Sequence, residues 1–419
     1  MFDIDRFQEI WVTISRNKAR SILTGFGVFW GIFMLIVMLG SGQGLQNGIM
    51  KNIDGFATNS CFFYTSATGE PYKGFRKGRH WNIRNRDIEA IQQSVPELAH
   101  ISPMLWGRGG TDNVVYNDKA GSFSVRGLYP SYTEIEQQRI KTGRFVNEVD
   151  IRQKRKVCVI GTTVYDEIFS QNEDPIGKYI RVNGIYYQVV GVSSGISQIS
   201  IGGRSDEAVV IPFTTMQQIN NQGDIVHMMG ATAKKGVKVE VLEEHIKQVL
   251  KSQNKISPTD MQAVGSFNIE KQFLMFDYLF IGISLVIWIV GVGTLLAGVI
   301  GVSNIMLVTV KERTKEIGIR RALGAKPLTI LRQIMSESFL LTSMAGIMGL
   351  CAGVGLLIAL DSGLEANAAE NNTFFAEPII PFFVAVSAMV ILLVCSLIAG
   401  AIPAWRALQI KAIDAIREE

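Results

Sequence analysis

Four long stretches with almost no charge constrain this 419-residue sequence more than any other feature. Residues 21–45, 278–310 and 379–404 carry no Asp, Glu, Lys or Arg, and residues 334–360 carry only Glu337. A helix needs about 20 apolar residues to cross a hydrocarbon core of roughly 30 Å. Helices in the core of soluble proteins rarely run this long without a charge. The sequence therefore predicts an integral membrane α-helical protein with four transmembrane helices.

The predicted helices divide the chain into membrane and soluble segments. We expect transmembrane helices at residues 21–45, 278–310, 328–360 and 379–404, preceded by a cytoplasmic amphipathic helix at 1–20. A cleaved signal peptide is the alternative for the first run, but its leader would contain Asp3, Asp5 and Glu9, so we interpret the run as a permanent anchor. The second run would extend over about 50 Å as a helix, which predicts a stalk beyond the bilayer.

Basic residues predict the orientation of the chain, because cytoplasmic loops are enriched in Lys and Arg. Such residues precede the first run, cluster between the second and third runs, and follow the fourth. The loop at 361–378 contains four acidic residues and no basic one. Both termini and the segment 311–327 are therefore predicted to be cytoplasmic, and residues 46–277 and 361–378 to lie outside.

Residues 46–277 are predicted to form a large α+β extracytoplasmic domain of two lobes. Short apolar stretches with strand patterning alternate with helical ones, and Asn183-Gly184 between alternating residues is a strong hairpin signal. One lobe would be an insertion, mostly β, at about 114–205. Cys61 and Cys158 fall in this domain and could pair, although two separate buried thiols are the simpler interpretation.

The residue types needed for catalysis or metal binding do not cluster in the sequence. Its four histidines are scattered, without metal-ligand spacing. Gly177-Lys178 lacks the earlier glycine and the Ser or Thr of a phosphate-binding loop, so we expect no cofactor in this chain and nucleotide binding elsewhere. A net charge of only +4 gives no indication of a nucleic-acid partner.

The most specific local pattern is the charged segment 311–327. Glu312 with Lys315 and Glu316 with Arg320 have the spacing of ion pairs on a helix. Gly324 can end that helix in a left-handed cap, and Pro327 can begin the next one. A loop that only fixes topology would need a few basic residues, whereas this pattern predicts a defined helix. The tail 405–419 predicts a second amphipathic helix, with Trp405, Leu408 and Ile416 on one face and Arg406 on the other, against the lipid bilayer or a partner.

Several motifs resemble those of the MacB/FtsX/LolC-type permeases. The segment Glu312 to Ala325, Glu-Arg-Thr-Lys-Glu-Ile-Gly-Ile-Arg-Arg-Ala-Leu-Gly-Ala, is similar to their hallmark sequence. Asn17 to Thr24 resembles their entry into the first span. Further similar motifs are Gly143-Arg144-Phe145, Val159-Ile160-Gly161, Pro175 to Lys178, Val189 to Val192, Pro403 to Ala407 and Ile413 to Arg417.

This resemblance implies a MacB-like permease subunit of an ABC transporter in the bacterial inner membrane. It implies a separate ABC ATPase subunit that holds ATP and Mg²⁺, and a second permease copy in a homodimer or related heterodimer. ATP-driven motion would pass to the periplasmic domain and export substrate, with a possible periplasmic adaptor and outer-membrane channel. The contacts to the ATPase would come from Glu312, Arg313, Glu316, Ile317, Gly318, Arg320, Arg321 and Gly324.

Two other functions fit the same topology. One is a LolC/LolE-like lipoprotein-releasing permease, and the other is an FtsX-like regulator of a cell-wall hydrolase that transports nothing. The size of the outer region, residues 46–277, favours the MacB type, since FtsX-type outer domains are smaller.

The predicted orientation can be tested with single cysteines in a background that lacks Cys61 and Cys158. An impermeant thiol reagent should label intact cells at Gly223→Cys and Asn372→Cys but not at Lys315→Cys, because basic segments stay in the cytoplasm. Labelling of Lys315→Cys in intact cells would reverse the topology. Labelling of the same variant after cell lysis serves as its control.

Overall fold

The computed structural model describes most of the chain, namely residues 18–53, 55–107, 112–170, 173–196, 201, 203–367, 375–378, 380 and 382–408. These residues form two compact units, which we call the membrane unit (Met1–Ile49 and Tyr278–Glu419) and the outer domain (Met50–Asp277). The predicted helix at 1–20 lies outside the described residues up to residue 17.

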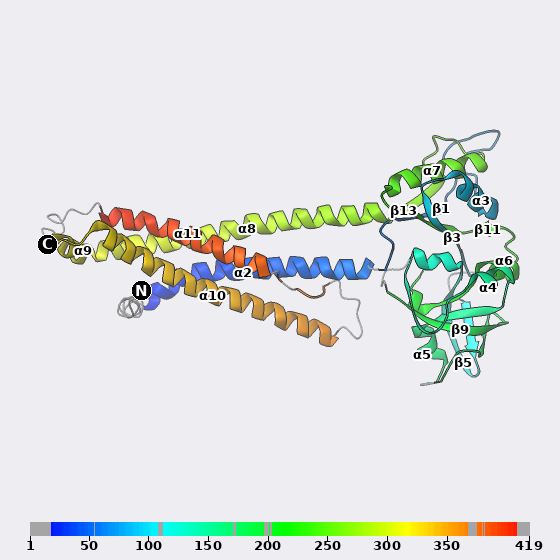
Figure 1. Cartoon of the computed structure of the whole chain (residues 1–419), viewed down its shortest axis with the longest axis horizontal. Coiled ribbons are helices and arrows are strands. Elements are labelled where there is room, and N and C mark those ends of the chain that lie inside the picture. Colours follow the sequence, from blue (N-terminus) through cyan, green and yellow to red (C-terminus); the bar gives the residue numbers. More distant parts are fainter. Residues whose placement is uncertain are drawn as a thin grey trace. The chain divides into compact units, whose positions relative to one another are not determined.

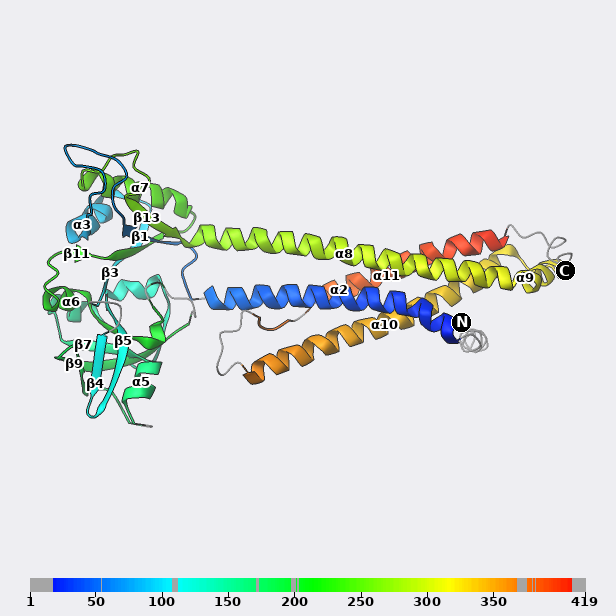
Figure 2. The ribbon, with the colours of Figure 1, turned by 180° about the vertical axis from the view of Figure 1, so that it is seen from behind.

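Within the residues that the structure describes, four helices are long and apolar enough to span a membrane. They are α2 (Lys18–Ile53), α8 (Ile269–Glu312), α10 (Pro327–Asn367) and α11 (Phe382–Leu408). Each overlaps one predicted span, and α2, α8 and α10 run several residues past the predicted limits. Figure 2 shows α8 as one unbroken ribbon. With 44 residues it is about 65 Å long, roughly twice the hydrocarbon thickness, as expected for a span with a stalk.

Glycines bring α2 and α8 into close contact. A Cβ atom on Gly298 would lie 2.8 Å from the carbonyl oxygen of Gly27, and one on Gly31 would lie 3.2 Å from that of Thr294. Neither position can therefore accept a larger side chain without moving a backbone. Small residues that permit such approach are the usual basis of helix packing in membranes, where lipid removes most of the hydrophobic driving force.

The Gly349-xxx-Gly353 pair packs α10 against the other side of α2. A Cβ atom on Gly349 would lie 2.6 Å from the carbonyl oxygen of Phe29, and one on Gly353 would lie 2.7 Å from Cγ2 of Ile36. This spacing is common at contacts between separate chains. Here it serves a contact within one chain, and α11 packs along α10 in turn (Figure 1).

One part of the outer domain is a four-stranded antiparallel arrangement in the order β3-β12-β1-β13. Helix α7 (Val239–Gln253) packs on it through Leu242, Ile246 and Leu250, whose spacing places them on one helical face. Helix α3 (Asn85–Ser94) packs against α7. The strands are β1 (Ser60–Thr65), β3 (Leu98–Trp106), β12 (Met228–Ala233) and β13 (Val264–Asn268).

In the other part, six strands pair in a closed ring, β5-β4-β8-β9-β7-β10 and back to β5. Both β7 and β10 are buried along their whole length, which explains their continuous apolar sequences. A seventh strand, β6 (Gln138–Gly143), pairs with β9. The six are β4 (Asp112–Tyr116), β5 (Lys119–Leu128), β7 (Val157–Gly161), β8 (Tyr179–Val182), β9 (Ile185–Gly195) and β10 (Ala208–Pro212).

Several smaller elements complete the outer domain. The helices are α4 (Glu148–Arg152), α5 (Thr162–Ile168) and α6 (Phe213–Ile219), with short 3₁₀ turns at Pro130–Glu134 and Ser205–Glu207. Strands β2 (Ile83–Arg84) and β11 (Ile225–Val226) pair separately.

The α+β class and the hairpin at Asn183-Gly184 are confirmed. Both residues have positive φ, 49° and 87°, as a two-residue type I′ turn requires. The strands of the ring span residues 112–212, which is nearly the range of the predicted insertion at 114–205. The division into two lobes stays a prediction, because β3 pairs with β12 through its first residues and with β5 through its last two.

Cys61 on β1 and Cys158 on β7 are both free thiols and fully buried. Burial raises the pKa of both thiols far above the ordinary value, since a thiolate loses its hydration there. The interpretation as two separate buried thiols is confirmed.

The glycine contacts predict an asymmetric response to substitution within α10. Gly349→Leu should destabilise the membrane unit by about 1–3 kcal/mol, because the new side chain would meet the backbone of α2. Gly355→Leu is the matched control, since Gly355 is exposed and a Cβ there meets nothing within 4 Å. Thermal unfolding of the purified protein in detergent measures both. Equal stability of the two variants would contradict the packing described here.

Candidate functional site

The charged segment predicted from sequence forms a compact helical corner. Helix α8 ends at Glu312, a short helix α9 covers Thr314–Ala322, and α10 begins at Pro327. Helical hydrogen bonding continues through the junction, since the Arg313 amide donates to the Thr309 carbonyl oxygen at 3.1 Å. Arg313 itself leaves helical geometry, with φ −94° and ψ 10°. The junction is therefore a bend between two helices.

Gly324 closes α9 as the sequence predicts. It has φ +90°, and its amide donates to the Arg321 carbonyl oxygen while the Ala325 amide donates to that of Arg320, each at 3.0 Å. These two bonds form a Schellman cap, which needs a left-handed residue at this place. Pro327 then begins α10, where its missing N–H costs no hydrogen bond.

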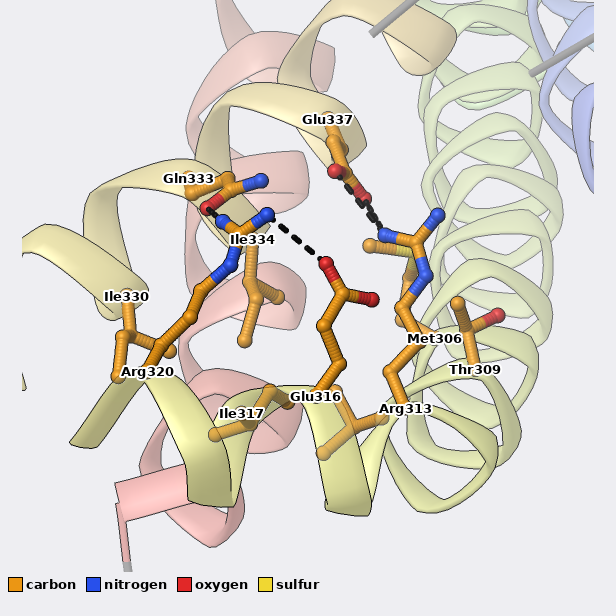
Figure 3. Close-up of a pocket in the computed structure, with 11 residues that line it drawn as sticks. Met306, Thr309, Arg313, Glu316, Ile317, Arg320, Ile330, Gln333, Ile334 and Glu337 are labelled. Carbon is orange, nitrogen blue, oxygen red and sulfur yellow. Dashed lines mark hydrogen bonds and ion pairs between the residues drawn. The ribbon is translucent and has the colours of Figure 1, made fainter. Parts of the chain in front are cut away.

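A partly buried ion pair joins the bend to α10. The Arg313 guanidinium donates to both carboxylate oxygens of Glu337, at 3.2 and 3.3 Å. The Glu337 side chain is 9% exposed and that of Arg313 is 32% exposed. Glu337 is the single charge of the third apolar run, and a carboxylate at such a place is stable only with a partner. Figure 3 shows the two side chains pointing toward each other.

Arg320 makes a second bridge between α9 and α10. Its guanidinium donates to Gln333 on α10 at 3.0 Å and to Glu316 on its own helix at 2.8 Å (Figure 3). The predicted pair of Glu316 with Arg320 is thus confirmed. Because both side chains turn toward α10, the pair also fixes the direction of α9.

The space enclosed by these contacts is too small for a substrate. A cavity of about 30 Å³, room for no more than about two or three water molecules, lies among the side chains of the corner. Ile317, Ile330 and Ile334 form its apolar wall, and all three are buried. The corner is therefore a packed joint and not a binding pocket.

The opposite face of α9 is open to solvent. Ile319 is 45% exposed and Leu323 is 83% exposed, and Lys315 lies one turn before Ile319 on the same face. Exposed apolar side chains at i and i+4, flanked by charge, are typical of a surface that another protein covers. Helix α9 thus has one face joined to α10 and one face free.

The predicted site residues of segment 311–327 all lie in or next to this corner. Arg313, Glu316, Ile317 and Arg320 line the cavity, and Gly318 is buried beside them. Glu312 is exposed at the end of α8, Arg321 lies in the last turn of α9, and Gly324 follows it.

The C-terminal residues of the prediction are separate from this corner in sequence. Trp405 is 71% exposed near the end of α11, and Arg406 and Leu408 are in its last turn. Ile416 lies outside the described residues.

Sequence reasoning missed Glu337 and Gln333 as partners of the corner. A lone carboxylate in an apolar run was a signal for Glu337, but nothing in the local pattern indicated Gln333. Within the described residues, no three His, Cys, Asp or Glu side chains gather as metal ligands would.

Two domain families match this chain. Residues 21–249, more than half of the sequence, match the MacB-like periplasmic core domain, and residues 288–412 match the FtsX-like permease C-terminal domain. The second match contains the whole corner formed by α9 and the ends of its neighbours.

Named proteins with similar sequences are exporters. A macrolide export ATP-binding/permease protein MacB from Bdellovibrio bacteriovorus is 26% identical over 99% of this chain and 62% of its own length. A pyoverdine export ATP-binding/permease protein PvdT from Pseudomonas putida is 29% identical over 99% of this chain and 60% of its own length. The chain thus spans about three fifths of these relatives.

A solved structure of the periplasmic region of MacB from Actinobacillus actinomycetemcomitans is also similar. It is 20% identical, with a TM-score of 0.44, and covers 55% of this chain and 97% of its own.

The ion pair in the corner predicts a strong response to removal of one partner. Arg313→Ala should destabilise the membrane unit by about 3–5 kcal/mol, because it removes a charged partner from the largely buried Glu337 carboxylate. The double variant Arg313→Met with Glu337→Leu should lose much less, since an apolar pair of similar volume needs no counter-charge. A double-mutant cycle of Arg313→Met, Glu337→Leu and their combination, from thermal unfolding in detergent, measures the coupling. Additive effects of the two substitutions would show that the pair contributes nothing.

Proposed function

This chain belongs to the MacB/FtsX-type family of ABC transporter permeases, and we propose that the open face of α9 couples it to an ATPase that drives export. The observation that carries the proposal is the two-sided character of α9. Bonds from Arg313 and Arg320 hold one face on α10, so the helix cannot turn independently of the bundle. The other face presents Ile319 and Leu323 to a partner.

A force applied to the open face would pass directly into the membrane helices. The bend at Arg313 connects α9 to α8, and Glu337 connects the same bend to α10. The cavity at the joint is too small to collapse far, so a displacement of α9 must move the ends of both helices. This supports α9 as the element that receives the motion of the ATPase.

The ATPase is proposed to be a separate subunit that binds ATP and Mg²⁺. The 419 residues contain no Gly-x-x-x-x-Gly-Lys-Ser/Thr sequence, which is the loop that holds nucleotide phosphates in ABC ATPases. The named relatives are ATP-binding/permease proteins, which supports an ATPase as the partner of this permease.

The substrate is proposed to be a small molecule handled outside the membrane. The relatives named above export macrolides and pyoverdine, and the similarity to them covers 99% of this chain. Within the four spans, Glu337 is paired with Arg313, so it is not a free carboxylate for ion-coupled transport. We further propose a dimer of permeases in the bacterial inner membrane, with an adaptor and an outer-membrane channel as possible partners.

Docking of the ATPase on the open face of α9 can be tested with Ile319→Asp and Leu323→Asp together. The substitutions should abolish co-purification of the ATPase subunit and lower ATP turnover in membranes at least tenfold, because they place charge in an apolar contact. The permease itself should keep its unfolding temperature, since both side chains are exposed.

Met261→Asp is the matched control, because Met261 is 94% exposed but lies in the outer domain. This variant should assemble and turn over ATP as the unsubstituted protein does. Normal assembly of the Ile319 and Leu323 double variant would show that the ATPase does not dock there.

A further inference from the structure

Helix α8 leaves the outer domain without a linker. Asn268 is the last residue of β13, and Ile269 is the first residue of α8. By contrast, residues 54–59 separate α2 from β1, although β1 and β13 are paired neighbours. Of these two connections between membrane and outer domain, only the one through α8 joins helix to strand directly.

Asn268 fixes this joint with both ends of its side chain. Its Oδ1 accepts the Lys271 amide at 3.0 Å, which caps the first turn of α8. Its Nδ2 donates to Oε2 of Glu243 on α7 at 2.9 Å, and the residue is only 6% exposed. The cap of α8 is thus held by a neighbouring helix and not by solvent.

Glu243 is the centre of a small buried network. Besides Asn268, its carboxylate accepts from Lys247 Nζ and Ser266 Oγ, each at 2.6 Å. Burial acts to raise the pKa of Glu243, but the hydrogen bonds from Lys247, Ser266 and Asn268 outweigh it and hold the pKa at about 2. The carboxylate is therefore charged, and Lys247 forms an ion pair with it.

The first turns of α7 and α8 also contact each other directly. Oε2 of Glu270 on α8 accepts the Val239 amide at the start of α7, at 2.8 Å. Lys271 Nζ lies 3.2 Å from Oε1 of Glu240 and 3.8 Å from Oε2 of Glu243. Since Glu270 caps α7 and Lys271 pairs with two carboxylates of α7, a change in direction of α8 would break these contacts.

The described contacts between α8 and the rest of the outer domain come mainly from these first turns. Ile269 is buried and Phe273 packs against the core of the domain. The next side chains are mostly exposed, with Leu274 at 48%, Met275 at 59% and Tyr278 at 72%. The polar contacts around Glu243 therefore hold the helix where its packing contacts are few.

We propose that Glu243, Asn268, Glu270 and Lys271 form a clamp through which the outer domain takes up movement of α8. The inference rests on the proposed function, in which ATP hydrolysis displaces the other end of α8. Without the clamp, α8 could pivot about its first turn, and the same displacement would leave the outer domain where it was. These four are positioning residues, which act through the direction of a helix.

The test is a nucleotide-dependent signal from the outer domain of the full complex in membranes. Tyr186 on β9 is 59% exposed, so Tyr186→Cys can carry a spin label in a background with Cys351 and Cys395 replaced by alanine. ATP should change the label's spectrum or its distance to the label of a second copy. Glu243→Gln should reduce that change at least fivefold, while ATP turnover and co-purification of the ATPase stay within twofold of the unsubstituted protein.

Glu244→Gln is the matched control, because Glu244 is the exposed neighbour of Glu243 on α7 and bonds only Gln248 among the contacts described here. If Glu243→Gln folds poorly, Lys271→Glu replaces it, since Lys271 is half exposed, and Glu240→Lys added to it should restore the signal by reversing the ion pair. A full signal from Glu243→Gln or from Lys271→Glu alone would overturn the clamp. Absence of any ATP response in the unsubstituted complex would instead overturn the proposed function together with it.

Discussion

A peptide group in the hydrocarbon of a bilayer has no water to bond, and this constraint shapes the rest of the molecule. Every residue in the membrane has to be in a helix whose hydrogen bonds are internal. Turns, bends and polar side-chain networks are consequently displaced to the helix ends. In this chain those ends hold the two best-defined polar assemblies along α8, the ion pair of Arg313 with Glu337 and the network around Glu243.

The two assemblies differ in the described contacts that stabilise the buried carboxylate. Arg313 and Glu337 form an ion pair beside the buried isoleucines of the corner, and it joins the bend after α8 to α10. Glu243 has three hydrogen-bond donors from two elements and shares the charge among them. The first arrangement holds two helices together at one point. The second holds the direction of a helix against a sheet.

Sequence patterns predicted the features that depend on local chemistry. Apolar length gave the four spans, a positive φ requirement gave Gly324 and the Asn183-Gly184 turn, and i,i+4 spacing gave the pair of Glu316 with Arg320. Each of these features is determined by residues that are close together in the sequence. General residue propensities and the geometry of helices and turns are therefore enough to predict it.

Features that depend on distant partners were beyond the sequence alone. The hallmark segment was expected to face a partner as a whole, yet Arg313 and Arg320 bond to α10, while Ile319 and Leu323 lie on an exposed face. Gly349 and Gly353 had the spacing of a dimer contact, but which helix they would meet depends on the three-dimensional path of the chain. The sharing of β3 between two groups of strands is a question of register, which a single strand sequence does not contain.

The two buried thiols of the outer domain have a consequence for how it is made. A domain outside the cytoplasm matures where oxidants act on exposed cysteines, and Cys61 and Cys158 lie on strands that are far apart in the sequence. While the chain is still open, both sulfur atoms can be oxidised or joined to a wrong partner. Once β1 and β7 are covered, both are inaccessible and poorly ionised. Folding of the domain therefore competes with oxidation of the two thiols, and rapid burial of the core protects them.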